Sequence, residues 1–164
     1  MPPDVICNTS PLLYLHRTEV LDWLPQLFGE IWITRGVKQE LETGRIKGFN
    51  VPHIDAYEWI KVVDPNVMPP EWLSIDLGIG ELSTMALALE NPGKIVVLDD
   101  ALARRHATVS GLIVWGTLKV LLEAKAKGLT ENVGPLLVRL EEQGMWFSEE
   151  IKIRILSLAG EKDR

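Results

Sequence analysis

The sequence predicts an α/β fold, in which a parallel sheet of about five strands is covered by helices on both faces. Two observations predict it. Five short apolar runs recur along the 164 residues, and segments with helix-forming composition separate them. Strands that alternate with helices are typical of parallel sheets whose two faces are both covered. A chain of this length is expected to form one domain, with a core over about 4–127 and a C-terminal helical extension over about 128–164.

The first half of the chain is expected to contribute three of the strands. Strands are predicted at 5–7, 30–33 and 59–63, and helices at 11–15, 20–28 and 34–43. The hydroxyl of Thr9 can cap the first helix, and Pro11 suits a first helical position. Thr34 can cap the third helix, which Gly44 is expected to end. Glycine and proline interrupt the residues that follow, so irregular structure is predicted there.

The second half is expected to contribute two strands and five helices. The strands are predicted at 94–98 and 113–115, and the helices at 80–90, 101–109, 116–127, 131–143 and 148–158. Asp99 and Asp100 end the strongest strand of the chain. A proline-rich surface loop is predicted over 64–76, and Trp72 within it is the tryptophan expected to be exposed and able to stack on a nucleobase. The other tryptophans are expected mostly in the core.

The composition describes an ordinary globular chain that carries net negative charge. Hydrophobic residues make up 46% and charged residues 24% of the sequence, which excludes a disordered chain. The net charge of −6 argues against broad electrostatic adhesion to nucleic acid. It does not exclude a nuclease, because the acids of a metal site themselves add negative charge. No apolar run approaches the roughly 20 residues of a membrane span, and no secretory signal is visible. The single cysteine, Cys7, fits a protein of the reducing cytoplasm.

Acidic and amide residues stand where predicted strands and helices meet. Asp99 and Asp100 follow a buried strand that has no room for charge, and Glu81 lies in the first turn of a helix. Glu40 lies about two turns into the helix after the second strand, and Asn8 ends the first strand. Such junctions lie along one edge of a parallel sheet, so these side chains can converge there on a divalent metal ion. The pattern therefore predicts phosphodiester chemistry at this edge.

Each of these residues also has a purely structural interpretation. Asp100 can cap the helix that follows it and pair with Arg104, four residues further on. Glu81 can stabilise a helix start through the helix dipole. Glu40 can belong to a charged helix face, and Asn8 can form a polar turn.

Other catalytic patterns are poor. Cys7 is expected to be a small core residue, and Ser10 lacks the glycines of a nucleophile elbow. The pair Gly78 and Gly80 lacks the third glycine of a dinucleotide fingerprint, and the chain has no phosphate-binding loop, which disfavours a nucleotide-binding doubly wound domain. The histidines show no metal-ligand spacing and are expected at the surface or in helix packing: His16, His53 and His106.

Taken together, these segments resemble the PIN-domain family, and in particular a short prokaryotic branch of PIN-like proteins. The resemblance covers nearly the whole chain and includes its C-terminal tail. It rests on five motifs that occur in order and with similar spacing: Asn8-Thr9-Ser10-Pro11-Leu12, Val37-x-x-Glu40-Leu41, Leu77-Gly78-x-Gly80-Glu81, Leu98-Asp99-Asp100-x-x-Ala103-Arg104 and Gly116-Thr117-Leu118.

The resemblance implies a three-layer α/β/α sandwich with an acidic pocket for Mg²⁺ or Mn²⁺. It also implies cleavage of RNA, often by the toxin of a toxin–antitoxin pair. RNA, a small antitoxin protein and a second copy of the chain are therefore the expected partners. The family's acids fall on Asn8, Glu40, Glu81 and either Asp100 or Asp99. Thr9 or Ser10 would orient a ligand or a water molecule, and Arg104 would contact a substrate phosphate or hold Asp100 in place.

Asn8 departs from the pattern of this branch, whose members usually begin with Asp-Thr-Ser-Pro-Leu. A neutral amide oxygen binds a divalent cation less strongly than a carboxylate does, so weaker metal affinity and weaker activation of water are expected. The alternative to an active ribonuclease is therefore a catalytically weakened or inactive PIN-like module. Such a module would keep the fold and a binding or regulatory role without cleavage.

Overall fold

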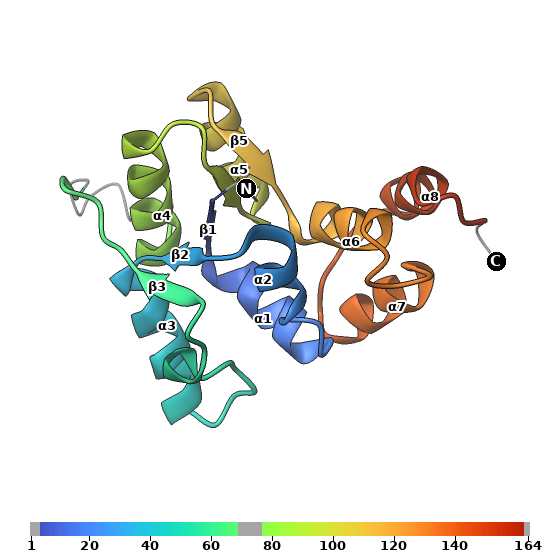
Figure 1. Ribbon diagram of the computed structural model, residues 1–164, viewed down its shortest axis with the longest axis horizontal. Coiled ribbons are helices and arrows are strands. Elements are labelled where there is room, and N and C mark those ends of the chain that lie inside the picture. The colour runs from blue at the N-terminus through green and yellow to red at the C-terminus, as the bar shows by residue number, and fades with distance from the viewer. Residues whose placement is uncertain (1–3, 69–76, 163–164) are drawn as a thin grey trace.

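The protein contains a five-stranded sheet in which every strand runs parallel to its neighbours, in the order β3-β2-β1-β4-β5. The computed structural model describes residues 4–68 and 77–162 (Figure 1). The chain builds the sheet outward from β1 to β3 and then crosses back to place β4 on the other side of β1. β1 and β4 therefore flank the topological switch point, the place where open α/β sheets bind ligands. The strands are β1 (Val5–Cys7), β2 (Ile31–Ile33), β3 (Ile60–Val62), β4 (Ile95–Val97) and β5 (Ile113–Trp115).

Helices connect the strands and follow the last of them. None of the helices that the structure describes is long and apolar enough to cross a membrane. In the described residues they are α1 (Thr9–Arg17), α2 (Trp23–Phe28), α3 (Arg35–Ile46), the short 3₁₀ helix η1 (Ile54–Ala56), α4 (Ile79–Glu90), α5 (Ala101–Val109), α6 (Thr117–Ala126), α7 (Gly134–Glu142) and α8 (Glu149–Leu158).

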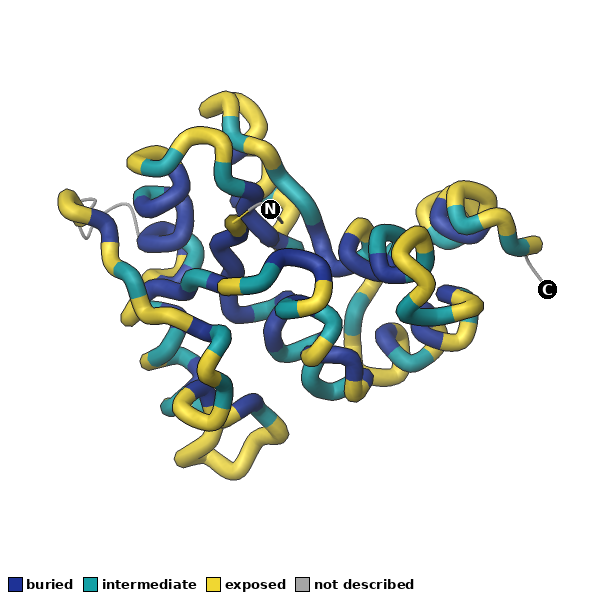
Figure 2. The backbone as a smooth tube through the Cα atoms, viewed as in Figure 1, coloured by how far each residue is buried: buried dark blue, intermediate teal, exposed yellow. Residues whose placement is uncertain are grey.

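The sheet has a separate hydrophobic core on each face, because successive residues of a strand point to opposite faces. On one face, Val5 and Cys7 of β1 pack with side chains of α1, α2, α3, α6, α7 and α8. On the other face, Ile6 of the same strand packs with side chains of α4 and α5. Figure 2 shows the buried residues, in dark blue, along the central strands. The chain is therefore an α/β/α sandwich, as predicted.

The strands and helices predicted from the sequence are present, with ends that differ by a few residues. Three local predictions are wrong. Pro11 is the third residue of α1 and not the first. Gly44 does not end α3, which continues beyond it, and the chain turns at Gly48, whose φ of +84° favours glycine. Thr9 does not cap α1, because Asn8 holds the N-cap position and the Thr9 hydroxyl donates instead to Glu40.

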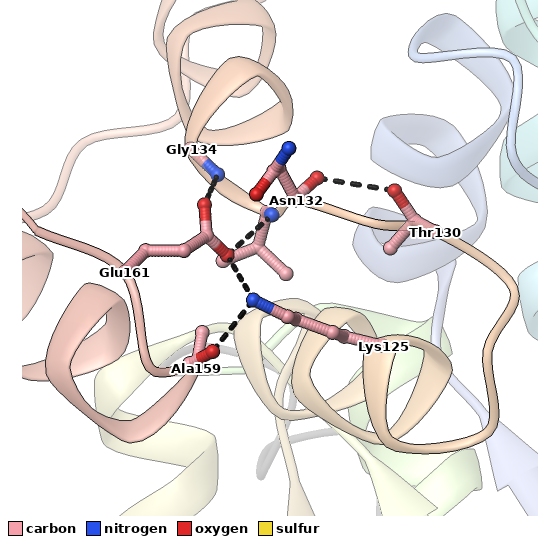
Figure 3. Close-up of polar contacts among 7 residues, drawn as sticks. Lys125, Thr130, Asn132, Gly134, Ala159 and Glu161 are labelled. Atoms are coloured by element: carbon pink, nitrogen blue, oxygen red, sulfur yellow. Dashed lines mark hydrogen bonds and ion pairs between the residues drawn. The ribbon is translucent and has the colours of Figure 1, made fainter.

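The C-terminal helices α6, α7 and α8 extend the molecule to one side of the sheet (Figure 1). A largely buried ion pair fastens them: Lys125 Nζ lies 2.9 Å from Glu161 Oε2 and donates to the Ala159 carbonyl at 2.6 Å (Figure 3). Glu161 also accepts from the N–H groups of Val133 and Gly134, at 2.8 Å and 3.0 Å. Since the N-cap residue of α7 offers no side-chain acceptor of its own, the Glu161 carboxylate caps that helix from a distant part of the chain.

Candidate functional site

A cavity of about 840 Å³ lies beside the carboxyl end of β4. Three acidic side chains line it: Glu81 from the start of α4, and Asp99 and Asp100 from the junction of β4 with α5. Helix α5 adds Arg104 and Arg105. Much of the remaining wall comes from α1, α6 and the segment between α7 and α8, and includes Ser10, Tyr14, Leu118, Met145, Trp146 and Phe147. The cavity thus combines carboxylates with two guanidinium groups.

Asp99 is held by Thr117 at the start of α6. The Thr117 N–H donates to Asp99 Oδ1 at 2.8 Å, and the Thr117 hydroxyl donates to Oδ2 at 2.6 Å. Burial raises the pKa of Asp99 above the ordinary aspartate range, while the two Thr117 hydrogen bonds and the positive charge of Arg104 act in the opposite direction. The Asp99 side chain is therefore fixed in place, with each oxygen already accepting one hydrogen bond.

Asp100 caps α5, in agreement with its structural interpretation, because its Oδ1 accepts from the Ala103 N–H at 2.8 Å. The expected ion pair with Arg104 is absent from the described residues, so that part of the prediction is wrong. Arg104 lies instead over Gly116, where a Cβ atom would overlap the guanidinium. Gly116 therefore leaves the space that lets Arg104 approach Asp99.

Glu81 lies close to two other acids. Its Oε2 accepts from the Gly78 N–H at 3.3 Å, which caps the start of α4. Burial raises the pKa of Glu81, and the negative charges of Asp100 and Glu40 raise it further, against the lowering effect of the Gly78 hydrogen bond. The carboxylates of Asp100 and Glu40, which come from two other segments, therefore disfavour the charged form of Glu81 at this edge of the sheet.

Glu40 joins the starts of α1 and α4. Its Oε2 accepts from the Thr9 hydroxyl at 2.7 Å, and its Oε1 accepts from the Gly80 N–H at 2.7 Å. A Cβ atom at residue 80 would overlap the Glu40 carboxylate, so the contact requires glycine. Thr9 therefore orients Glu40, which is not among the residues that line the cavity.

Asn8 lies between β1 and α1 with only 2% of its surface exposed. Its backbone N–H donates to the Val97 carbonyl at 3.1 Å, which extends the pairing of β1 with β4 by one residue. Its side-chain Oδ1 is buried and accepts no hydrogen bond from the described residues. A buried oxygen without a donor costs about 1–3 kcal/mol, so this atom is expected to accept from water or to bind a cation.

The donors at this edge suit a hard divalent cation. Glu81 and Asp100 offer carboxylate oxygens and Asn8 offers an orphaned amide oxygen, which are the ligand types that Mg²⁺ and Mn²⁺ prefer. A cation would also offset the repulsion that raises the pKa of Glu81. No three of the carboxylates that the structure describes at this edge have ligand atoms that all lie within 4.8 Å of one another. Water would therefore fill several coordination positions of the ion, as is usual for Mg²⁺.

A tighter group of ionisable side chains lies elsewhere, at the surface. In the described part of the chain, Glu42, His53 and Asp55 are the only three His, Cys, Asp or Glu residues whose ligand atoms all lie within 4.8 Å of one another. The sequence spacing of His53 did not indicate this group. Asp55 already pairs with Lys38 at 3.1 Å, which explains the cluster of charges without a metal.

Several cavity residues were not anticipated from the sequence. Trp146 is 85% exposed, contrary to the expectation that the tryptophans other than Trp72 lie mostly in the core. The sequence feature that could have indicated an exposed aromatic side chain is the adjacent pair Trp146-Phe147, which lies in the segment between two predicted helices. Trp72 itself lies outside the described residues. The other tryptophans pack against the two cores but stay partly exposed: Trp23, Trp32, Trp59 and Trp115.

Comparison with known proteins supports the fold. A family model described as a PIN domain matches residues 4–161, nearly the whole chain. No curated protein matches the chain at a significant level. PIN domains are generally nucleases and typically use divalent metal ions, which agrees with a set of acids at the switch point of the sheet. The chain therefore belongs to the PIN-domain family.

Proposed function

We propose that the protein is a metal-dependent ribonuclease that hydrolyses phosphodiester bonds in RNA at the cavity beside β4. One observation carries the proposal: Glu81, Asp99 and Asp100 line this cavity together with Arg104 and Arg105. Carboxylates hold divalent cations and guanidinium groups bind phosphates, and metal-assisted phosphodiester hydrolysis uses both. Membership of the PIN-domain family supports the same assignment.

Residues from four segments would hold Mg²⁺ or Mn²⁺. Asn8, Glu81 and Asp100 each offer an oxygen, and Glu40 keeps further lone pairs on the two oxygens that Thr9 and Gly80 already contact. When bound, such an ion lowers the pKa of water and polarises the scissile phosphate. Asp99, fixed by Thr117, would contribute negative charge beside Asp100 that favours the cation.

The residues on the other side of the cavity would bind the substrate. Arg104 lines the cavity without an ion-pair partner in the described residues, so its guanidinium is available to a substrate phosphate. Arg105 is exposed on the same helix and lines the same cavity. The hydroxyl of Ser10 can orient water or a ligand there.

A second candidate function rests on Asn8. The amide supplies a neutral oxygen where a carboxylate would supply a full charge, which weakens the hold on a divalent cation. A catalytically weakened or inactive PIN-like module that binds and regulates is therefore the alternative proposal. The two proposals differ in one measurable outcome, which is cleavage of RNA.

The proposal also includes partners and a location. A small antitoxin protein would control the nuclease if it is the toxin of a toxin–antitoxin pair, and a second copy of the chain would form a homodimer. The buried, unpaired thiol of Cys7 is compatible with the reducing cytoplasm. Co-expression of the chain with its genomic neighbours, followed by size-exclusion chromatography, tests both partners.

Cleavage of single-stranded RNA by the purified protein tests the proposed function. We expect cleavage with Mn²⁺ or Mg²⁺, none with EDTA, and a loss of at least about 100-fold in Asp100→Asn. Asparagine is as good an N-cap as aspartate, so this variant keeps the start of α5 and isolates the loss of charge. Asp22→Asn, at an exposed acid that holds the N-cap position of α2 outside the cavity, is the matched control. Undiminished cleavage in EDTA or in Asp100→Asn contradicts the mechanism.

A further inference from the structure

We propose that Trp146 is a platform on which an unpaired nucleobase of single-stranded RNA stacks, while Arg104 and Arg105 bind the neighbouring phosphates. This inference rests on the proposed ribonuclease function and extends it, because it names the part of the substrate that the site recognises. It concerns the apolar wall of the cavity, which includes Trp146 and contributes none of the proposed metal ligands.

The chain holds the Trp146 side chain outward. The residues on either side of it, Met145 and Phe147, pack against the hydrophobic core, whereas Trp146 is 85% exposed. This alternation is the pattern of a segment whose successive side chains point to opposite sides. Its two ends are fixed: the Met145 N–H donates to the Leu140 carbonyl at 3.0 Å, and the Ser148 hydroxyl caps α8. The indole is therefore presented by a restrained backbone and not by a free loop.

The position of the indole points to a ligand with both flat apolar and charged parts. Trp146 lines the same cavity as Arg104, Arg105 and Asp100, and the highly exposed Val109 lines it as well. A tryptophan has a large apolar area, which stabilises the molecule only when something covers it. A nucleobase has the flat face that stacks on an indole, and the phosphates beside it suit the two guanidinium groups.

The same reasoning favours single-stranded RNA over a duplex. In a duplex the faces of the bases are stacked on one another, so an exposed aromatic side chain has no base to cover it. In a single strand every base has a free face, and stacking on an aromatic side chain contributes about 1–3 kcal/mol per base with little dependence on sequence. The proposed contact therefore supplies affinity for unpaired RNA beside the acidic residues.

Binding in EDTA, where metal-dependent cleavage cannot occur, tests the proposal. The probes are a short single-stranded oligoadenylate and an abasic ribose-phosphate oligomer of the same length and charge. The proteins are the wild type, Trp146→Ala, Trp146→Phe and, as a matched control, Ile153→Ala, which removes a half-exposed apolar side chain of α8 outside the cavity. Affinity is measured by fluorescence anisotropy of labelled oligomers, and the thermal unfolding of each variant checks that it is folded.

We expect Trp146→Ala to bind oligoadenylate about tenfold more weakly than the wild type, and Trp146→Phe to retain most of the affinity. Ile153→Ala should match the wild type, and all four proteins should bind the abasic oligomer equally. Equal affinity of wild type and Trp146→Ala for oligoadenylate overturns the proposal, and so does an equal loss for both oligomers. If the wild type binds neither oligomer but self-associates through Trp146, the apolar wall of the cavity is a protein-binding surface, and the proposal is overturned as well. Trp146-dependent binding without cleavage in metal would support the platform while contradicting the ribonuclease, so the two failures are distinguishable.

Discussion

Asn8 stands where the resemblance to PIN-like sequences leads us to expect an aspartate, and the effect of the amide depends on the acids around it. Burial and the charges of Asp100 and Glu40 already raise the pKa of Glu81. A further carboxylate in this region would add repulsion when no cation is present. The neutral amide of Asn8 therefore favours the metal-free fold, and in the proposed site it would bind a divalent ion less strongly than a carboxylate.

Asn8→Asp is predicted to strengthen metal binding and to destabilise the metal-free protein. The added charge should raise Mn²⁺ affinity roughly tenfold, because the charge of the ligands tunes affinity at oxygen sites. The cost of burying that charge should lower the free energy of unfolding without metal by about 1–3 kcal/mol. Urea unfolding with and without Mn²⁺ measures both effects, with the exposed Asn132→Asp as control. A variant less stable in both conditions, with unchanged Mn²⁺ affinity, would show that Asn8 is not a metal ligand.

At the scale of elements, the contact of Glu40 with Gly80 fixes how α3 and α4 approach each other. The Glu40 carboxylate reaches the first turn of α4 only because residue 80 has no side chain. The same carboxylate holds the Thr9 hydroxyl at the start of α1. Three elements that contribute to the site are thus positioned by one side chain.

Gly80→Ala is predicted to destabilise the protein by about 1–3 kcal/mol, because the new Cβ displaces the Glu40 carboxylate from its hydrogen bonds with the Gly80 N–H and the Thr9 hydroxyl. Gly78→Ala is the matched control, since a Cβ there would lie 3.7 Å from Glu40 Oε1, an ordinary contact. The midpoint of urea unfolding measures the difference between the two variants. If both variants unfold at the same urea concentration, the close approach at residue 80 does not constrain the fold.

The elements could be predicted from the sequence more fully than the site. The apolar runs 5–7 and 95–98 are each bounded by polar residues. The existence of these strands, and the position of Asp99 and Asp100 at a strand exit, therefore follow from local pattern. Contacts between distant segments do not. Pairing of Asp99 with Thr117 depends on how α6 packs, and the exposure of Trp146 depends on the packing of α7 and α8. Neither leaves a periodic signal in the sequence.

At the scale of the whole molecule, Glu161 ties the end of the described chain to α6 and α7 through a network that depends on pH. Burial alone would raise the pKa of Glu161, but the N–H groups of Val133 and Gly134 and the Lys125 ammonium stabilise the charged form and lower it (Figure 3). A carboxylate with a lowered pKa stabilises the fold above its unfolded-state pKa, and this contribution is lost as the pH falls through the folded-state value.

Glu161→Gln is therefore predicted to lower stability in a pH-dependent way. At neutral pH the loss should be about 1–2 kcal/mol, since the amide weakens the ion pair and the cap of α7. The wild type and the variant should converge as the pH falls below about 4, where glutamate becomes protonated. Thermal unfolding across this pH range measures the difference, with the exposed Glu131→Gln as control. A constant difference at every pH would mean that the charge of Glu161 contributes nothing.

In the proposed mechanism, acids at the β1–β4 edge hold the divalent ion that RNA cleavage needs. Titration of Mn²⁺ by calorimetry into the wild type, Asp100→Asn and His53→Ala tests it most directly, because His53 belongs to the only tighter group of ionisable side chains in the described residues. We predict that Asp100→Asn binds Mn²⁺ at least about tenfold more weakly than the wild type and that His53→Ala binds it normally. If Mn²⁺ binding is retained in Asp100→Asn and lost in His53→Ala, the metal site is not at the β1–β4 edge. That result would contradict the proposed mechanism and place the site at the surface group of Glu42, His53 and Asp55.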